Sequence, residues 1–239
     1  MEEYYFTFRG IDSRELGLRV VSMPPRIKPA RRYEEHTVPG RSGKARIWDG
    51  AYESIQLPVG VYLPYLQGTA VSETPEIMRA LDGEGWLTLS DRPGRKYFAV
   101  VSGEASYDTW IQGFEERVST ILFEADPEAY FMDNDPISVT ASGQFISNPG
   151  NRDAEPVIEL TGSGEVTLMV GQFISTLQLG GGGTLVVDVP AGMVTAGGEI
   201  VENGLEGDWP ILKPGANAVS WNGSVTDLKI TVNARDVGW

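Results

Sequence analysis

The stretch VIELTGSGEVTLMVGQFISTLQLGGGGTLVVDV, residues 157–189, decides the fold of the second half of the chain. Its apolar runs are short, and glycine-rich or polar turns separate them. Short apolar runs at close spacing are typical of the antiparallel strands of a β-sandwich. Similar runs follow at residues 218–221 and 228–232. We therefore expect an antiparallel β-sandwich over this half.

The first half also has the pattern of strands. Tyr4, Phe6 and Phe8 alternate with more polar residues, which is the period of a half-buried strand. One short helix is expected over residues 75–82, because Thr74 can cap its start and proline suits the first helical position. The expected fold class is therefore mainly β, with one short helix in the N-terminal part.

A domain boundary is expected near the turn Asp133-Asn134-Asp135-Pro136. Residues 1–133 carry 15 Lys and Arg against 21 Asp and Glu, whereas residues 134–239 carry 4 against 12. Glycine rises from 12 residues in the first part to 17 in the shorter second part. The sequence thus predicts two domains, 1–133 and 134–239, both of ordinary domain size.

Composition excludes several classes of function. The chain has no cysteine and a single histidine, His36, so thiol chemistry, disulfides and multi-histidine metal sites are excluded. The net charge of -14 argues against a surface that wraps nucleic acid. No apolar leader and no membrane-length apolar stretch is visible. We expect no cofactor, no metal, no membrane contact and synthesis in a cytoplasm.

Motifs for catalysis are also missing. Gly40-Arg41-Ser42-Gly43-Lys44 departs from the phosphate-loop pattern, because its second glycine comes too early and Ala45 follows the lysine. Paired carboxylates can hydrolyse glycosides. The candidate pairs are Glu115-Glu116, Asp126 with Glu128, and Asp133 with Asp135. Solvated acidic surface explains these pairs better in so acidic a chain, and we expect no catalytic residue.

Two features remain as candidate sites. Seven basic residues fall within 21 positions that hold only two acids, Glu34 and Glu35. These basic residues are Arg26, Lys28, Arg31, Arg32, Arg41, Lys44 and Arg46. The basic segment is either an electrostatic contact with an acidic partner, which includes another copy of the chain, or a solvated hairpin with locally paired charges. The second feature is a set of six tryptophans, of which Trp209 and Trp221 are candidate sugar-stacking residues.

Short motifs occur in a fixed order along nearly the whole chain. In the first half they are Phe6-Thr7-Phe8-Arg9-Gly10-Ile11-Asp12-Ser13, Leu16-Gly17-Leu18, Pro24-Pro25, Val38-Pro39-Gly40-Arg41-Ser42-Gly43, Leu87-Thr88-Leu89-Ser90-Asp91 with Tyr97-Phe98, Phe114-Glu115-Glu116-Arg117-Val118, and Phe123-Glu124-Ala125-Asp126-Pro127 with Tyr130. In the second half they are Asn148-Pro149-Gly150-Asn151, Glu155-Pro156-Val157-Ile158, Gly162-Ser163-Gly164, Asp208-Trp209-Pro210-Ile211-Leu212, and Lys213-Pro214-Gly215-Ala216-Asn217 before Val219-Ser220-Trp221. This order resembles that of siphophage distal tail proteins, the Dit family.

The resemblance implies a structural hub in the virion tail. Such proteins form a hexameric ring that joins the tail tube protein to the tail-associated fibre or spike protein, while DNA passes through the lumen without specific binding. The N-terminal domain is a β-rich, barrel-like belt with one helix that builds the ring. The C-terminal domain is a galectin-like β-sandwich, on which receptor-binding or baseplate proteins dock. The family brings no catalytic residues, and the basic segment becomes a candidate subunit interface.

The galectin-like fold does not bring a galectin-type sugar site with it. The second half contains no histidine, and its arginines are Arg152 and Arg235 alone. Function follows from the site and not from the fold. The alternatives to a tail hub are a carbohydrate-binding adhesion module that uses Trp209 or Trp221, a glycoside hydrolase, and a tube protein that forms long stacked tubes.

Overall fold

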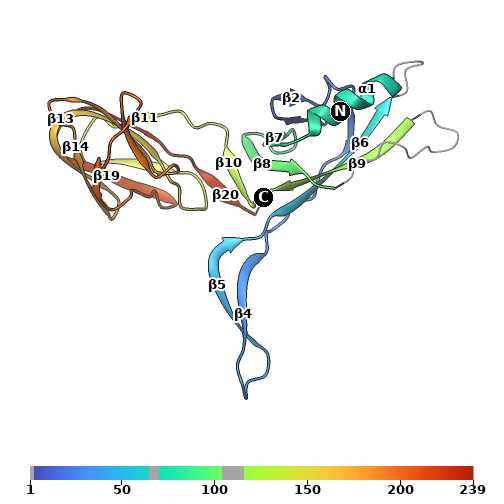
Figure 1. Cartoon of the computed structure of the whole chain (residues 1–239), viewed down its shortest axis with the longest axis horizontal. Helices are drawn as coiled ribbons and strands as arrows, with labels where there is room; N and C mark the ends of the chain where they lie inside the picture. The colour runs from blue at the N-terminus through green and yellow to red at the C-terminus, as the bar shows by residue number, and fades with distance from the viewer. Residues whose placement is uncertain (1–2, 65–69, 104–115, 239) are drawn as a thin grey trace. The chain divides into compact units, whose positions relative to one another are not determined.

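The computed structural model describes residues 3–64, 70–103 and 116–238 (Figure 1). The chain forms two compact units. The first comprises Met1–Ala129 with Val237–Trp239, and the second comprises Tyr130–Asp236. Strands β10 (Glu128–Phe131) and β20 (Arg235–Val237) are the segments in which the chain crosses from one unit to the other. Each unit is described by itself.

The first unit is built on an antiparallel sheet with the strand order β2-β1-β7-β8-β9-β6-β3. Its strands are β1 (Phe6–Phe8), β2 (Ile11–Asp12), β3 (Arg19–Ser22), β6 (Ile55–Pro64), β7 (Glu84–Leu89), β8 (Arg95–Val101) and β9 (Glu116–Ala125). The longest ladder joins β6 to β9, from the Ile55–Ala125 pair to the Pro64–Glu116 pair. Two further strands, β4 (Arg31–Thr37) and β5 (Lys44–Tyr52), pair only with each other and form a separate two-stranded sheet.

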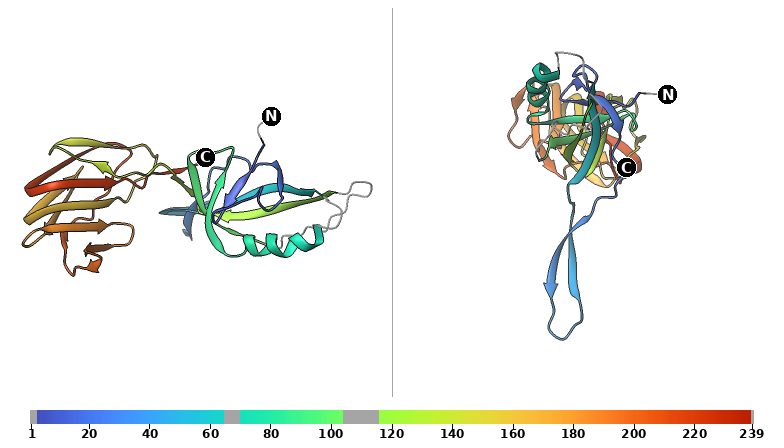
Figure 2. Two further views of the ribbon diagram at one scale, coloured as in Figure 1. Left: turned by 90° about the horizontal axis from the view of Figure 1, so that it is seen from above. Right: turned by 90° about the vertical axis from the view of Figure 1, so that its right-hand side faces the viewer.

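One face of the main sheet carries the core of this unit. Leu57, Val59 and Val61 alternate along β6 and are fully buried, as the period of a strand requires. Phe123 of β9 contacts Phe6 and Phe8 of β1, with ring centroids 5.5 and 5.3 Å apart. Helix α1 (Ala70–Leu81) runs along this face and buries Ile77 and Leu81 in the same core (Figure 2).

The expected helix boundary was wrong at its start. The helix begins at Ala70 and holds Pro75 in its interior, whereas the sequence predicted a start at Pro75 with Thr74 as its cap. The end was predicted within one residue, at Leu81 before Gly83. The prediction gave most weight to Pro75, because proline is usual in the first turn of a helix, although Ala70 already lies seven positions before Ile77 on the helical period.

The second unit is a two-layer antiparallel sandwich. Its strands are β11 (Ile137–Ser138), β12 (Gln144–Asn148), β13 (Val157–Val170), β14 (Phe173–Gln178), β15 (Gly183–Asp188), β16 (Met193–Ala196), β17 (Glu199–Ile200), β18 (Leu205–Gly207) and β19 (Gly215–Thr231). One layer contains β11, β15, β16 and β17, and the other contains β12, β14 and β18. Strands β13 and β19 are long enough to take part in both layers.

The two layers meet at a bend in β13 and β19, where the register of their ladder shifts between Ser163 and Thr167. Glycines make this close approach possible. A Cβ added to Gly162 would lie 2.1 Å from the carbonyl oxygen of Ser224. Gly223 has φ of +117°, and an added Cβ would lie 2.6 Å from the carbonyl oxygen of Glu165. Both contacts are with backbone, so only glycine fits.

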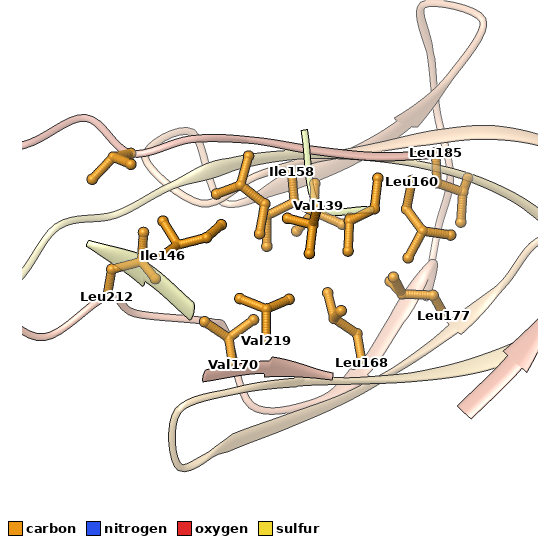
Figure 3. Packing of buried hydrophobic residues seen from close by; sticks show 14 of the residues in the cluster. Val139, Ile146, Ile158, Leu160, Leu168, Val170, Leu177, Leu185, Leu212 and Val219 are labelled. Atoms are coloured by element: carbon orange, nitrogen blue, oxygen red, sulfur yellow. The ribbon is translucent and has the colours of Figure 1, made fainter. Parts of the chain in front are cut away.

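The core of the sandwich fills the space between the layers (Figure 3). Ile158 and Leu160 come from the first part of β13, and Leu168 and Val170 come from the part beyond the bend. Figure 3 shows these two pairs on opposite sides of the core. One bent strand thus supplies both walls. The prediction of a mainly β chain with a helix in its first part and a β-sandwich in its second part is confirmed.

The bend predicts a strong effect of Gly162→Ala. The new methyl group would overlap the Ser224 carbonyl, so the two strands must separate, at a cost of about 1–3 kcal/mol in the free energy of unfolding. Hydrogen exchange of the β13 and β19 amides, measured at increasing urea concentrations, reports this loss of stability. Gly181→Ala is the matched control, because no atom lies within 4 Å of its added Cβ. Equal protection of these amides in the two variants would contradict the prediction.

Candidate functional site

The basic segment predicted from the sequence, residues 26–46, overlaps the β4–β5 hairpin, which we call the arm (residues 31–52). Figure 1 shows β4 and β5 as a separate pair of strands, which follow β3 and precede β6 in the chain. Every residue of β4 is exposed to solvent. All seven basic residues of the segment are exposed as well: Arg26, Lys28, Arg31, Arg32, Arg41, Lys44 and Arg46.

Local pairing accounts for three of these seven charges. The Nε of Arg32 lies 2.5 Å from the carboxylate of Asp49. Lys44 and Arg46 share one carboxylate, that of Glu35, at 2.5 and 3.0 Å. The two bases therefore keep one net positive charge between them. The local-pairing interpretation of the segment is correct for these residues but not for all seven.

Arg31 is held by aromatic side chains instead. Its guanidinium lies 4.3 Å from the centre of the Trp48 ring. Contacts with Tyr52 and then Tyr33 raise the pKa of Arg31. For Lys28 and Arg41 the described part of the chain shows no ion pair. Arg41 lies in the turn at the tip of the arm, between β4 and β5.

The arm also exposes apolar surface. Tyr33 pairs with Trp48 across the two strands, and their side chains are 42% and 37% exposed. The Trp48 ring packs edge-on against Tyr52 at 5.7 Å. Ile47, next to Trp48 along β5, is 57% exposed. A two-stranded hairpin has no second layer to cover such side chains, and aromatic side chains next to charge are typical of contact surfaces.

The root of the arm is fixed by Arg92, which sequence reasoning missed. This arginine is only 4% exposed. Its Nη2 donates to the carbonyl oxygens of Pro24 and Pro25 at 2.8 and 2.9 Å, and its Nη1 donates to the hydroxyl of Tyr97 at 3.2 Å. The two prolines lie in the segment that leads from β3 into the arm. Arg92 belongs to the turn Asp91-Arg92-Pro93-Gly94, in which an arginine is normally exposed, so the local sequence gave no signal of burial.

The candidate carboxylate pairs have different positions. Asp126 and Glu128 lie close enough to interact, because burial first, and then Glu128 and Glu84, raise the pKa of Asp126. Asp133 and Asp135 are both exposed. Glu115 lies outside the described residues, as does Trp110. Within residues 3–64, 70–103 and 116–238, no three acidic or histidine side chains are grouped so that they could hold a metal ion.

The two candidate sugar-stacking tryptophans do not share a platform. Trp221 lies on β19 opposite Leu168 and packs against the sandwich core. Trp209 follows β18 and is 37% exposed. Strands β13 and β14 lie between β19 and β18. Sugar stacking at either residue stays a prediction. None of the helices in the described ranges has the length and apolar character needed to span a bilayer.

Comparison with known proteins shows the fold. No family model matches the sequence, and no curated protein sequence matches it. Among solved structures, the chain is similar to the Dit protein of phage SPP1, which is described as a paradigm of the hub adsorption apparatus in phages that infect Gram-positive bacteria. The TM-score is 0.75, over 96% of this chain and 99% of that chain, at 18% sequence identity.

The chain has the fold of a phage Dit protein. The resemblance to distal tail proteins drawn from the sequence is therefore confirmed at the level of the fold. It extends over both units, because the alignment covers almost all of both chains.

Removal of the Arg92 side chain tests the root of the arm. In Arg92→Met, the buried carbonyl of Pro24 and the partly buried carbonyl of Pro25 lose a charged donor, so the free energy of unfolding should fall by about 2–3 kcal/mol. Thermal unfolding checks this, with Arg79→Met on the exposed face of α1 as the control. An unchanged melting temperature in Arg92→Met would show that the contacts to Pro24 and Pro25 carry no stability.

The charge pairs of the arm predict a pH dependence. Hydrogen bonds from Lys44 and then Arg46 lower the pKa of Glu35. A lowered pKa in the folded state means that the pairing stabilises the arm above the ordinary glutamate pKa and is lost as the pH falls through the folded value. NMR titration should show a higher Glu35 pKa in the Lys44→Met, Arg46→Met double variant than in the wild type. Lys213→Met, in the sandwich, is the control, and equal Glu35 pKa values in all three proteins would contradict the assignment.

Proposed function

We propose that the protein is a non-enzymatic structural hub at the distal end of a siphophage tail. The main support for this proposal is the structural similarity to a Dit hub protein over 96% of this chain. In this proposal six copies form a ring that joins the tail tube protein to the tail-associated fibre or spike protein, with receptor-binding or baseplate proteins on the outside. The protein is then a component of the virion tail.

The two halves of the chain take different roles in this proposal. Residues 1–133 form the ring, and residues 134–239 form a galectin-like sandwich on which other tail proteins dock. The exposed basic segment, Arg26 to Arg46, supplies a subunit interface. A ring built from one repeated head-to-tail contact joins two different patches, so a basic segment on an acidic chain is a suitable half of such a contact.

A structural role agrees with the chemistry of the described residues. The sequence lacks the motifs of the enzyme classes considered above, and the described residues group no metal ligands. An acidic lumen would repel DNA phosphate and let the genome pass. A carbohydrate-binding adhesion module is the alternative, and the exposed Trp209 is the side chain that it would use. Glycan-array binding that is lost in Trp209→Ala would favour that alternative.

Ring formation is the direct test. Size exclusion with light scattering should give a species of six times the 26.0 kDa chain, about 156 kDa, and negative-stain images of that peak should show a six-fold ring. The double variant Arg31→Glu, Arg32→Glu should shift the protein toward monomer, because it places negative charge in the basic segment. Long stacked tubes would indicate a tube protein instead. A monomer that does not assemble even with tube and spike proteins would contradict the hub.

A further inference from the structure

Charge is unevenly divided along this chain. Residues 26–46 carry seven basic and two acidic residues, a net charge of +5. The whole chain carries -14, so the rest of the molecule carries -19. Local ion pairs within the arm leave Arg41 at its tip without an acidic partner among the described residues. An exposed basic tip on so acidic a molecule is complementary in charge to an acidic surface.

The first unit contains such a surface on the outer face of its main sheet. Glu84 of β7 and Glu124 of β9 both lie beside Val100 of β8, because Val100 pairs with each of them. Three residues in register on adjacent strands share one face. This face is opposite to the core, because the alternating residues Ala99 and Phe123 are buried.

The acidic face is hollowed. A cavity of about 160 Å³ is lined by Ser54, Glu84, Phe98, Val100, Glu124 and Asp126, together with Ala99 of β8 and Ala125 of β9. In the described part of the chain no ion pair joins Glu84, Glu124 or Asp126 to a base. The raised pKa of Asp126 agrees with this, since partial burial and neighbouring acids disfavour its charged form. A cation that entered the hollow would relieve this repulsion.

The same face offers apolar contact beside the acids. Trp86 is 40% exposed and Val100 is 39% exposed. The Trp86 ring packs edge-on against Phe98 at 5.5 Å, and the Nζ of Lys96 lies 4.4 Å from its centre. The acidic hollow is thus bordered by exposed aromatic and aliphatic side chains. The arm exposes side chains of the same types, Tyr33, Ile47 and Trp48.

We propose that the tip of the arm of one copy docks into the acidic hollow of Glu84, Glu124 and Asp126 on the main sheet of the next copy. The occupant is a second copy of this chain, and Arg41 is the residue that enters. The proposal rests on the proposed ring and names its two contacting patches. Seven residues of β4 extend about 23 Å, so the arm is long enough to reach beyond its own unit. The other bases of the arm, Arg31, Arg32, Lys44 and Arg46, contact the rim, whereas Arg26 and Lys28 precede the arm.

Two variants with complementary charge reversals test this docking. The first, Arg41→Glu with Ser42→Glu, reverses the tip and leaves the pairs Lys44–Glu35, Arg46–Glu35 and Arg32–Asp49 intact. The second, Glu124→Lys with Asp126→Lys, reverses the hollow. Each variant alone should lose the ring on size exclusion with light scattering, because like charges meet at every contact.

An equimolar mixture of the two variants should form the ring again. A reversed tip then meets a reversed hollow, and an unchanged tip meets an unchanged hollow, so an alternating ring with an even number of copies satisfies every contact. A variant that had failed to fold could not assemble with its complement, so restoration also excludes misfolding. The control Glu202→Lys, Glu206→Lys lies on the sandwich, changes the charge by the same amount as the Glu124→Lys, Asp126→Lys variant and should leave the ring intact.

Three outcomes would overturn the proposal. If either variant alone forms rings like the wild type, the tip and the hollow are not in contact, while the hub itself stands. If both variants lose the ring and the mixture does not restore it, or if the control also loses it, the two patches are not each other's partners. If the wild type never forms a ring, the docking and the proposed ring fail together.

Discussion

The arm has no hydrophobic core, and the proposed function depends on how it keeps its shape without one. A two-stranded hairpin is marginally stable in water, so cross-strand contacts must supply what a second layer supplies elsewhere. Here these are the ion pairs at Glu35 and Asp49 and the stack of Arg31 on Trp48. Contacts of this kind on a surface are individually weak. The arm is therefore shaped before it meets a partner and can be stabilised further by one.

The same contacts decide which charges are left for binding. Glu35 engages two bases and Asp49 engages one, so the basic segment is less positive at its middle than its composition suggests. The residual positive charge lies at the tip, on Arg41 and on the Lys44–Arg46 pair, and toward the root, on Arg31 and Lys28. From the sequence alone, local pairing and partner binding were competing explanations of the whole segment. The structure shows local pairing for Arg32, Lys44 and Arg46, because strand register determines which base faces which acid, and partner binding by the other bases stays a prediction.

Much of the fold could be predicted from the sequence, and the exceptions have physical causes. Alternation and glycine turns predicted the strands of the sandwich, because a strand shows its burial pattern in its own residues. The bend in β13 could not be predicted, since Gly162 is required by the backbone of Ser224, a distant residue. The buried Arg92 was missed because its acceptors, the carbonyls of Pro24 and Pro25, lie far away in the chain. Long-range register and packing are the information that periodicity lacks.

The acidic hollow was hidden for the same reason. Glu84 and Glu124 are 40 positions apart, and only the pairing of both with Val100 places them on one face. In the sequence they are two members of a large set of acids with no pattern. Trp209 and Trp221 also could not be told apart from the sequence. In the structure Trp221 packs on the core, whereas Trp209 is exposed. A candidate site formed by neighbours on different strands can therefore be recognised only when the strand register is known. A charge cluster within one hairpin can be recognised from the sequence alone.

Separate basic and acidic patches on one chain have a geometric consequence. A self-complementary patch pairs two copies about a two-fold axis, and the association stops at a dimer. Two different patches repeat head to tail, so association continues until the rotation per copy closes a ring. Salt screens exposed charges over about 8 Å under physiological conditions. The charges therefore raise the rate at which two copies meet more than they raise the affinity of the contact. The aromatic and aliphatic side chains beside both patches must then supply the lasting affinity, which makes the geometry of Trp48 and Trp86 as important to closure as the charges around them.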